Sequence, residues 1–454
     1  MSKKNAMNAS ALNNRRLSVI RQSLFLLMLS LLFISFNSAV IFPKMFGYAD
    51  EIFLFLSLSV IIFLILSEFR GNRLKKLLFI LIIYFFYQII NWYVSPFNVS
   101  LKLALAQSFI NIKVFLVSIA VVMLRRGSRL DLSATKYVFY TMLLLFSAGM
   151  IINFIFQEAW HALLGRLEAS TYRYGFIRPI GWLGHPGQNA YFFTLSFSTI
   201  FLLFAKKPVI KSGLFIKKFF LFIVIDFLMA FPLTVRKGLM MTIPFGVISI
   251  NSVKGIDRIL LFLFLFFFGF LFFFIIKDMS IFKDTINNLK NFTHSDHAYI
   301  RGLMVYHGYS LFIDFFPFGT SPATFGTVLS QYNTLEVYEY VGIPSVYFRD
   351  GEFSGVYDSG LFSMLAENGF FGMILITVFI NYYFKLNRAR LDSYNYIVFK
   401  IITWFSILLS LTEPVWQNGM FTASYLINVL YIYTKNDVFR VGGVWVRKGL
   451  KSRL

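Results

Sequence analysis

Residues 103–124 read LALAQSFINIKVFLVSIAVVML, and Lys113 is the one charged residue among them. A run of about 20 predominantly apolar residues is long enough to cross the hydrocarbon core of a membrane as an α-helix. Similar runs recur along the chain, which is 57% hydrophobic and only 14% charged, whereas soluble domains average about 25% charged residues. The sequence therefore predicts an all-α integral membrane protein.

These runs predict about twelve transmembrane helices within one membrane domain over residues 1–454. The predicted spans are roughly 23–43, 52–67, 77–94, 103–124, 137–155, 189–205, 219–233, 238–251, 259–276, 360–384, 396–411 and 420–434. Between the ninth and tenth spans lies a long polar segment, residues 278–358, which we expect to form a cap outside the membrane.

The lysines and arginines, which give a net charge of +22, are concentrated in the two tails and in alternate loops. With twelve spans, all of these segments fall on one side of the membrane. Because basic loops stay in the cytoplasm, both termini are predicted to be cytoplasmic and the cap extracytoplasmic. The charge is then next to anionic membrane lipids, and we expect no nucleic-acid partner.

The cap is predicted to contain a helix from His294 to Phe316, which Pro317 ends. His297 and Arg301 lie four residues apart and therefore on one face of this helix. A turn-rich segment follows, PFGTSPATFG from Pro317 to Gly326. His294, His297 and His307 do not form a metal motif, the chain has no cysteine, and no nucleotide-binding glycine pattern is present, so we expect neither metal nor cofactor.

Three arginines on the extracytoplasmic side run against the charge bias: Arg178, Arg236 and Arg301, with Lys237 next to the second. The rigid donor fork of arginine suits phosphate oxygens, and three such groups on separate loops could converge on one diphosphate. The alternative is that each arginine reaches lipid headgroups or pairs with a carboxylate.

Two further segments carry candidate residues. The sequence RPIGWLGHPGQN, from Arg178 to Asn189, precedes the sixth span, and Asn189 is predicted to cap that helix, with His185 beside it. Asp358 stands at the start of the tenth span, where a carboxylate either acts as a general base or simply stabilises the helix start. Glu367 lies further along the same span and is expected to have a partner, because a carboxylate at that depth is costly.

Other residues admit two interpretations. Lys113 and Asp226 are predicted to lie in mid-membrane, where they either pair with each other or line a polar pathway. A set of aromatic residues either stacks on sugars or belongs to the membrane-interface belt: Trp160, Tyr172, Tyr174, Trp182 and Tyr347.

From Arg178 to Gly372 the chain resembles the bacterial O-antigen polymerases, called Wzy, and the related O-antigen ligases. The resemblance rests on four features in order: an arginine before a Gly/Pro-Asn helix start (Arg178 to Asn189), a short turn with Arg236, a cap helix with Arg301 leading into Pro-x-Gly, and Glu-Asn-Gly-x-x-Gly from Glu367 to Gly372. Ligases of this group usually carry His-Asn where this chain has Asp358-Ser359, which favours polymerase.

The resemblance implies a GT-C-like glycosyltransferase in the bacterial cytoplasmic membrane. Its expected substrates are undecaprenyl-diphosphate-linked oligosaccharides: a growing glycan as donor and a single repeat unit as acceptor. A chain-length regulator is a candidate partner. Arg178, Arg236 and Arg301 would bind the diphosphates and Asp358 would receive the hydroxyl proton, while His185, Asn189, Lys237, His297 and Tyr347 are candidates for substrate contact.

Three alternatives stay open at this point. An O-antigen ligase would transfer the finished glycan to lipid A core. A lipid-linked oligosaccharide flippase would use charges inside the membrane, such as Lys113 and Asp226. A structural or receptor-like membrane protein would make the placement of the arginines accidental.

Overall fold

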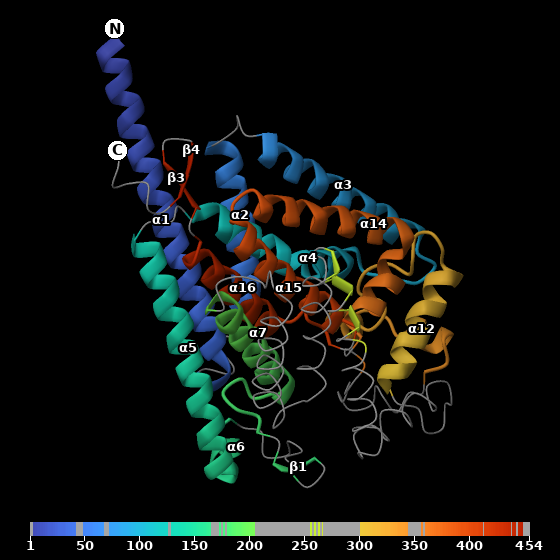
Figure 1. Ribbon diagram of the computed structural model, residues 1–454. Helices are drawn as coiled ribbons and strands as arrows, with labels where there is room; N and C mark the ends of the chain where they lie inside the picture. Colours follow the sequence, from blue (N-terminus) through green and yellow to red (C-terminus); the bar gives the residue numbers. More distant parts are fainter. Residues whose placement is uncertain are drawn as a thin grey trace.

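A computed structural model of the chain describes residues 3–41, 49–67, 72–125, 129–164, 172–173, 176–177, 179–204, 255–256, 258–259, 262–263, 266, 300–343, 356, 359–411, 413–436, 438–441 and 444–447. Helices dominate this part of the chain (Figure 1). The described helices of at least fifteen residues are α1 (Lys3–Ile41), α2 (Ala49–Ser67), α3 (Asn72–Val94), α4 (Leu101–Leu124), α5 (Arg129–Ile155), α7 (Pro186–Phe204), α12 (Ile300–Asp314), α14 (Gly360–Arg388), α15 (Ser393–Leu409) and α16 (Gly419–Thr434).

The smaller elements lie at the ends of this helical array. Short helices are α6 (Gln157–Leu163), α13 (Glu336–Tyr340) and the 3-10 turn η2 (Val328–Tyr332). Two antiparallel hairpins pair β1 (Tyr172–Arg173) with β2 (Phe176–Ile177) and β3 (Val438–Val441) with β4 (Val444–Arg447).

Within the described residues, five helices are long and apolar enough to cross a membrane. Their spanning segments are Leu17–Asn37, Lys75–Val94, Leu101–Leu124, Leu130–Ile155 and Gly360–Arg388. Shorter apolar helices, Ile52–Leu64 and Ser393–Leu409, accompany them. The chain is therefore a helical membrane protein, as its composition predicts.

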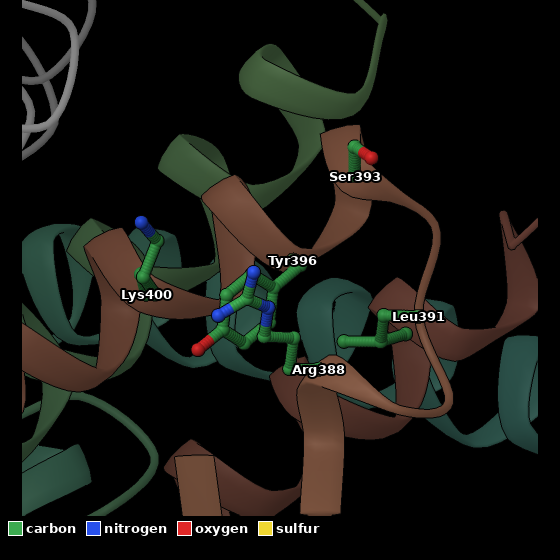
Figure 2. A pocket seen from close by; sticks show the side chains of 5 residues that line it. All are labelled: Arg388, Leu391, Ser393, Tyr396 and Lys400. Atoms are coloured by element: carbon green, nitrogen blue, oxygen red, sulfur yellow. The ribbon is translucent and has the colours of Figure 1, made fainter. Parts of the chain in front are cut away.

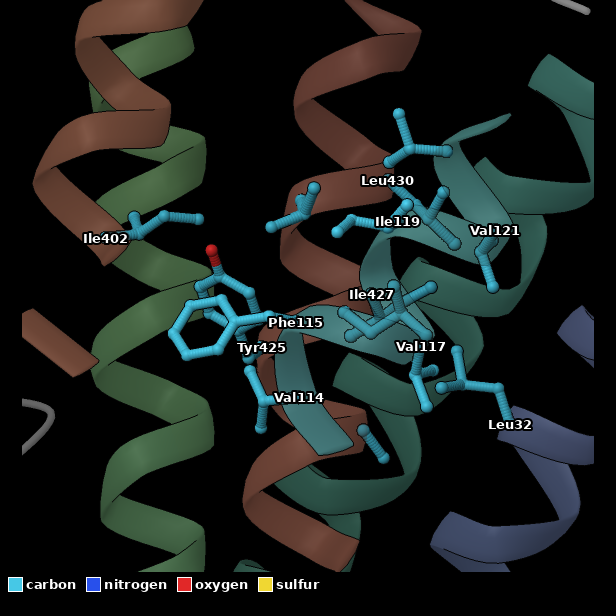
Figure 3. Packing of buried hydrophobic residues seen from close by; sticks show 14 of the residues in the cluster. Leu32, Val114, Phe115, Val117, Ile119, Val121, Ile402, Tyr425, Ile427 and Leu430 are labelled. Atoms are coloured by element: carbon cyan, nitrogen blue, oxygen red, sulfur yellow. The ribbon is translucent and has the colours of Figure 1, made fainter. Parts of the chain in front are cut away.

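The helices α4 and α16 form the centre of the bundle. Residues 111–122 of α4 are all buried, and so is every residue of α16 from Phe421 to Thr434. Both helices are buried on all sides over these residues, so they are surrounded by other helices rather than by lipid. Figure 3 shows Phe115 of α4 and Tyr425 of α16 in the cluster of buried side chains that joins them.

The outer helices pack around this centre. The helices α2 and α3 contact α4, while α5, α7 and α15 contact α16. Close aromatic pairs hold several of these contacts, such as Phe139 of α5 stacked on Tyr431 of α16 with ring centroids 4.0 Å apart. Inside a membrane, such close packing rather than the hydrophobic effect holds helices together.

Most predicted spans that fall on described residues coincide with helices, but α1 begins at Lys3, twenty residues before the predicted start at 23, and α5 also begins early. The helix α5 begins at Arg129, eight residues before the predicted start at 137, because its first turns are amphipathic and bury Asp131. Lys113 is buried in α4, whereas Asp226, with the predicted spans 219–233 and 238–251, lies outside the described residues.

Candidate functional site

The helix α14 is broken inside its length. Gly369 has φ 58° and ψ −165°, so backbone groups on both sides of it lose their helical partners. The turn that follows α12 supplies replacements: the N–H of Thr320 donates to the Ala366 carbonyl (2.9 Å), and the N–H of Phe370 donates to the Pro317 carbonyl (2.8 Å). The break is therefore a docking point for residues 317–327, which we call the docked turn.

Glycine is required on both sides of this contact. A Cβ on Gly369 would lie 2.3 Å from the carbonyl carbon of Phe318, and one on Gly319 would lie 2.6 Å from the Ala366 oxygen. Both glycines also have positive φ values. Pro-x-Gly and Glu-Asn-Gly, which the sequence shows as separate motifs, are thus two halves of one structure.

A row of polar side chains on α3 donates hydrogen bonds to carbonyl groups at the break. The Tyr87 hydroxyl lies 2.7 Å from the Asn368 carbonyl and 3.0 Å from the Phe318 carbonyl. The amide of Asn91 donates to the Glu367 carbonyl (2.8 Å). Because buried carbonyls without partners are costly, these side chains stabilise the broken conformation.

The carboxylate of Glu367 lies buried at the centre of this arrangement. Its Oε1 accepts hydrogen bonds from the N–H of Thr324 (2.9 Å), the N–H of Phe325 (3.1 Å) and the hydroxyl of Thr327 (2.6 Å). Its Oε2 has no hydrogen-bond partner within the described part of the chain. As predicted, this carboxylate has partners, and they are mainly backbone groups of the docked turn.

The break lies near the end of α14 opposite its basic residues. The basic end of α14 carries Lys385 and Arg388. At a rise of about 1.5 Å per residue, Gly369 is about 24 Å from Lys385, and the hydrocarbon core is about 30 Å thick. The first turns of α14, with Glu367, therefore lie almost one membrane thickness from the basic end of the helix.

The helix α12 and its Arg301 are attached to this same region. A Cβ on Gly308 would lie 3.0 Å from the Cβ of Phe362, and the docked turn that follows α12 meets Ala366. Residue numbers thus increase in the same direction along both helices, which lie side by side (Figure 1). Arg301, which is half-buried in the first turn of α12, is therefore located toward the N-terminal end of α14, which begins after Ser359.

The prediction that Asn189 caps α7 is wrong. The helix begins earlier, at Pro186, and the exposed His185 precedes it and accepts the N–H of Gly187 at its Nδ1 (3.1 Å). The buried amide of Asn189 instead donates to the carbonyls of Ile180 and His185, which fastens the preceding loop to the helix. Proline at the first helical position is the sequence signal for the true start.

Two of the aromatic residues considered for sugar stacking are structural. Trp160 is buried, and its indole N–H donates to the Gly181 carbonyl (3.0 Å). The indole N–H of Trp182 donates to Asn37 of α1 (3.0 Å). Both rings are therefore used to hold the loop before α7.

The remaining predicted site residues lie outside the described part of the chain. This applies to Arg178, Arg236, Lys237, His297, Tyr347 and Asp358. Of the predicted site residues, the structure places Arg301, His185 and Asn189, and it packs the helix that bears Arg301 against α14. Among the described residues, no group of three or more histidines and carboxylates could hold a metal ion.

The polar row on α3 was not considered among the candidate residues. Tyr84, Gln88, Asn91 and Ser95 follow one another at intervals of three or four residues within an otherwise apolar run, and Tyr87 adjoins Gln88. This spacing puts them on one face of a helix and was the available signal.

No model of a known protein family matches the chain, and no curated protein matches it in sequence. An argument about function therefore rests on the geometry of the broken helix and on the chemistry of the residues around it.

Proposed function

We propose that the chain is a glycosyltransferase of the O-antigen polymerase kind, with about twelve spans and a GT-C-like cap. It would transfer a growing glycan from undecaprenyl diphosphate to an undecaprenyl-diphosphate-linked repeat unit at the outer face of the bacterial cytoplasmic membrane. One observation carries the proposal: the helix with Arg301 is fastened to α14 at the end of the bundle opposite Lys385 and Arg388.

The position of Arg301 supports binding of a lipid diphosphate. Basic residues of membrane proteins gather on the cytoplasmic side, so the basic end of α14 is assigned to the cytoplasm and α12 to the outer side. A lipid diphosphate holds its charge at the membrane surface, close to the level of the broken helix. A guanidinium on a helix anchored there is preorganised for phosphate oxygens.

The reaction needs little beyond this charge stabilisation. The acceptor hydroxyl oxygen forms a bond to the anomeric carbon, and the bond from that carbon to the phosphate oxygen breaks. The diphosphate leaves with the electron pair, and the hydroxyl proton passes to a base, for which Asp358 is the candidate. In this proposal Arg178 and Arg236 join Arg301 around the diphosphates. Elongation of the glycan requires no nucleotide.

Glu367 contributes by anchoring α12 through the docked turn. The carboxylate holds the backbone of the docked turn, and the turn holds α12 against α14. Glu367 is thus a positioning residue, which acts on substrate through the location of Arg301.

A test uses purified protein in liposomes with lipid-diphosphate-linked repeat units and no nucleotide. The expected product is a ladder of glycans that differ by one repeat unit. Arg301→Ala is expected to abolish the ladder, and Arg301→Lys to weaken it, because an ammonium lacks the bidentate fork. Lys102→Ala, which removes an exposed cation at the start of α4, is the matched control and should keep the ladder.

A full ladder from Arg301→Ala would overturn the assignment of this arginine. Transfer of glycan only to lipid A core would identify a ligase instead.

A flippase is the second candidate, and a row of buried polar residues in α4 favours it. Gln107, Asn111 and Lys113 are buried, and Gln417 donates to Asn111 (3.3 Å) from the segment before α16. Polar residues inside the membrane often mark a transport pathway. Movement of the lipid between leaflets without elongation would support this function.

A further inference from the structure

A pocket opens at the turn between α14 and α15, at the basic end of the bundle and far from the broken helix. It has a volume of about 440 Å³ and is lined by Arg388, Leu391, Ser393, Tyr396 and Lys400 (Figure 2). No part of the proposed reaction uses this pocket.

The pocket combines two cations with hydroxyl groups. Arg388 comes from the end of α14 and Lys400 from α15, and their like charges repel each other. The Lys400 ammonium lies 5.3 Å from the centroid of the Tyr396 ring. The carboxylate of Asp392 in the same turn accepts the N–H and the side-chain amide of Asn395 (both 2.8 Å), which caps α15. Two cations that line one pocket and repel each other are stabilised by an anion bound between them.

An apolar surface continues from the pocket toward the membrane interior. Phe384 lies one helical turn from Arg388 on α14, and Trp404 lies one turn from Lys400 on α15. Their rings stack with centroids 6.1 Å apart and an interplanar angle of 25°. Trp404 is 45% exposed, so this aromatic pair is open to the lipid.

The cations at the ends of the helices and the aromatic pair further along them thus follow the order of headgroup and acyl chain in a phospholipid. Lys400 lies about 10 Å along α15 from its first residue, a depth from which a lysine side chain extends back to the membrane surface. The cations suit a phosphate group, and the aromatic pair suits the first part of an acyl chain. A soluble phosphate compound would leave the aromatic pair unused.

We propose that this pocket binds the phosphate headgroup of an anionic glycerophospholipid, with an acyl chain against Phe384 and Trp404. The lipid holds the ends of α14 and α15 together. The proposal is independent of the polymerase assignment, because it concerns the opposite end of α14 and requires no glycan.

The test measures the melting temperature of the detergent-purified protein with added phosphatidylglycerol, phosphatidylcholine or inorganic phosphate. Phosphatidylglycerol should raise the melting temperature more than either of the other two. Lys400→Gln should weaken the apparent affinity for phosphatidylglycerol about 10-fold or more, as expected for loss of a charge-assisted contact. Trp404→Ala should weaken it as well, while Lys385→Gln, an exposed cation on α14 outside the pocket, should not.

Other results would overturn the proposal. Equal stabilisation by inorganic phosphate would show that the pocket takes a free anion. An equal loss of affinity in Lys385→Gln and Lys400→Gln would show a general surface attraction instead of a site. Native mass spectrometry of bound lipid provides the same comparison if a variant melts too early, and equal retention of phosphatidylglycerol by wild type and Lys400→Gln would refute the site.

Discussion

Replacing Gly369 with alanine is expected to expel the docked turn from the break in α14. The new Cβ would lie 2.3 Å from the Phe318 carbonyl carbon and 2.5 Å from the Gly319 nitrogen. These are backbone atoms, which cannot rotate away as a side chain does. The backbone of Gly369, with φ 58° and ψ −165°, is also in a region that essentially only glycine adopts.

The expected cost follows from two contributions. An unfavourable backbone conformation costs about 1–3 kcal/mol, and overpacking costs about another 1–3 kcal/mol. The free energy of unfolding should therefore fall by about 2–6 kcal/mol, or the turn should undock with a similar loss. The docked turn positions α12, so elongation activity should fall as well.

The assay is thermal unfolding of the detergent-purified protein, with the surviving fraction measured by size-exclusion chromatography. Gly342→Ala is the matched control: Gly342 has φ 70°, but a Cβ there would meet nothing within 4 Å. This control should lose only the backbone contribution. If the two variants melt at the same temperature, the close contact at the break does not exist and the reasoning is refuted.

Three further substitutions test the surroundings of the site. Glu367→Ala leaves two backbone N–H groups and a hydroxyl without an acceptor, which costs about 1–3 kcal/mol for each group, whereas Glu367→Gln keeps an acceptor oxygen. The alanine variant should therefore lower the melting temperature much more than the glutamine variant. Equal melting temperatures for the two variants would contradict this account. Tyr87→Phe should destabilise the protein by about 1–3 kcal/mol, since carbonyls at the break lose a donor, while Tyr93→Phe on the exposed face of α3 should be silent in the same melting assay. Asn189→Ala should cost about 1–3 kcal/mol through the loop before α7; similar melting of Gln188→Ala would argue against a specific anchor.

Helix positions could be predicted because a membrane span needs a long apolar run. The last predicted span, 420–434, matches α16 (Gly419–Thr434) almost residue for residue. The start of α5 was missed because its first turns at Arg129 are amphipathic, and an apolar run detects only the part inside hydrocarbon.

The site could be predicted only in pieces. Residue type and motif order identified Arg301, Glu367 and the Pro-x-Gly motif, but their association depends on contacts between segments far apart in sequence, such as Thr320 with Ala366. The role of Asn189 was misjudged for a related reason: the same residue type caps a helix or anchors a loop, and Pro186 decides between the two.

The order of synthesis gives the broken helix a further consequence. The chain is made from its N-terminus, so Tyr87 and Asn91 exist first, the docked turn second and Gly369 last. When α14 leaves the ribosome, every group that its interrupted backbone needs is already present on the nascent chain. A circular permutant that delivered residues 360–388 before residues 317–327 would have to insert an unsatisfied helix, and its yield of inserted protein should fall accordingly.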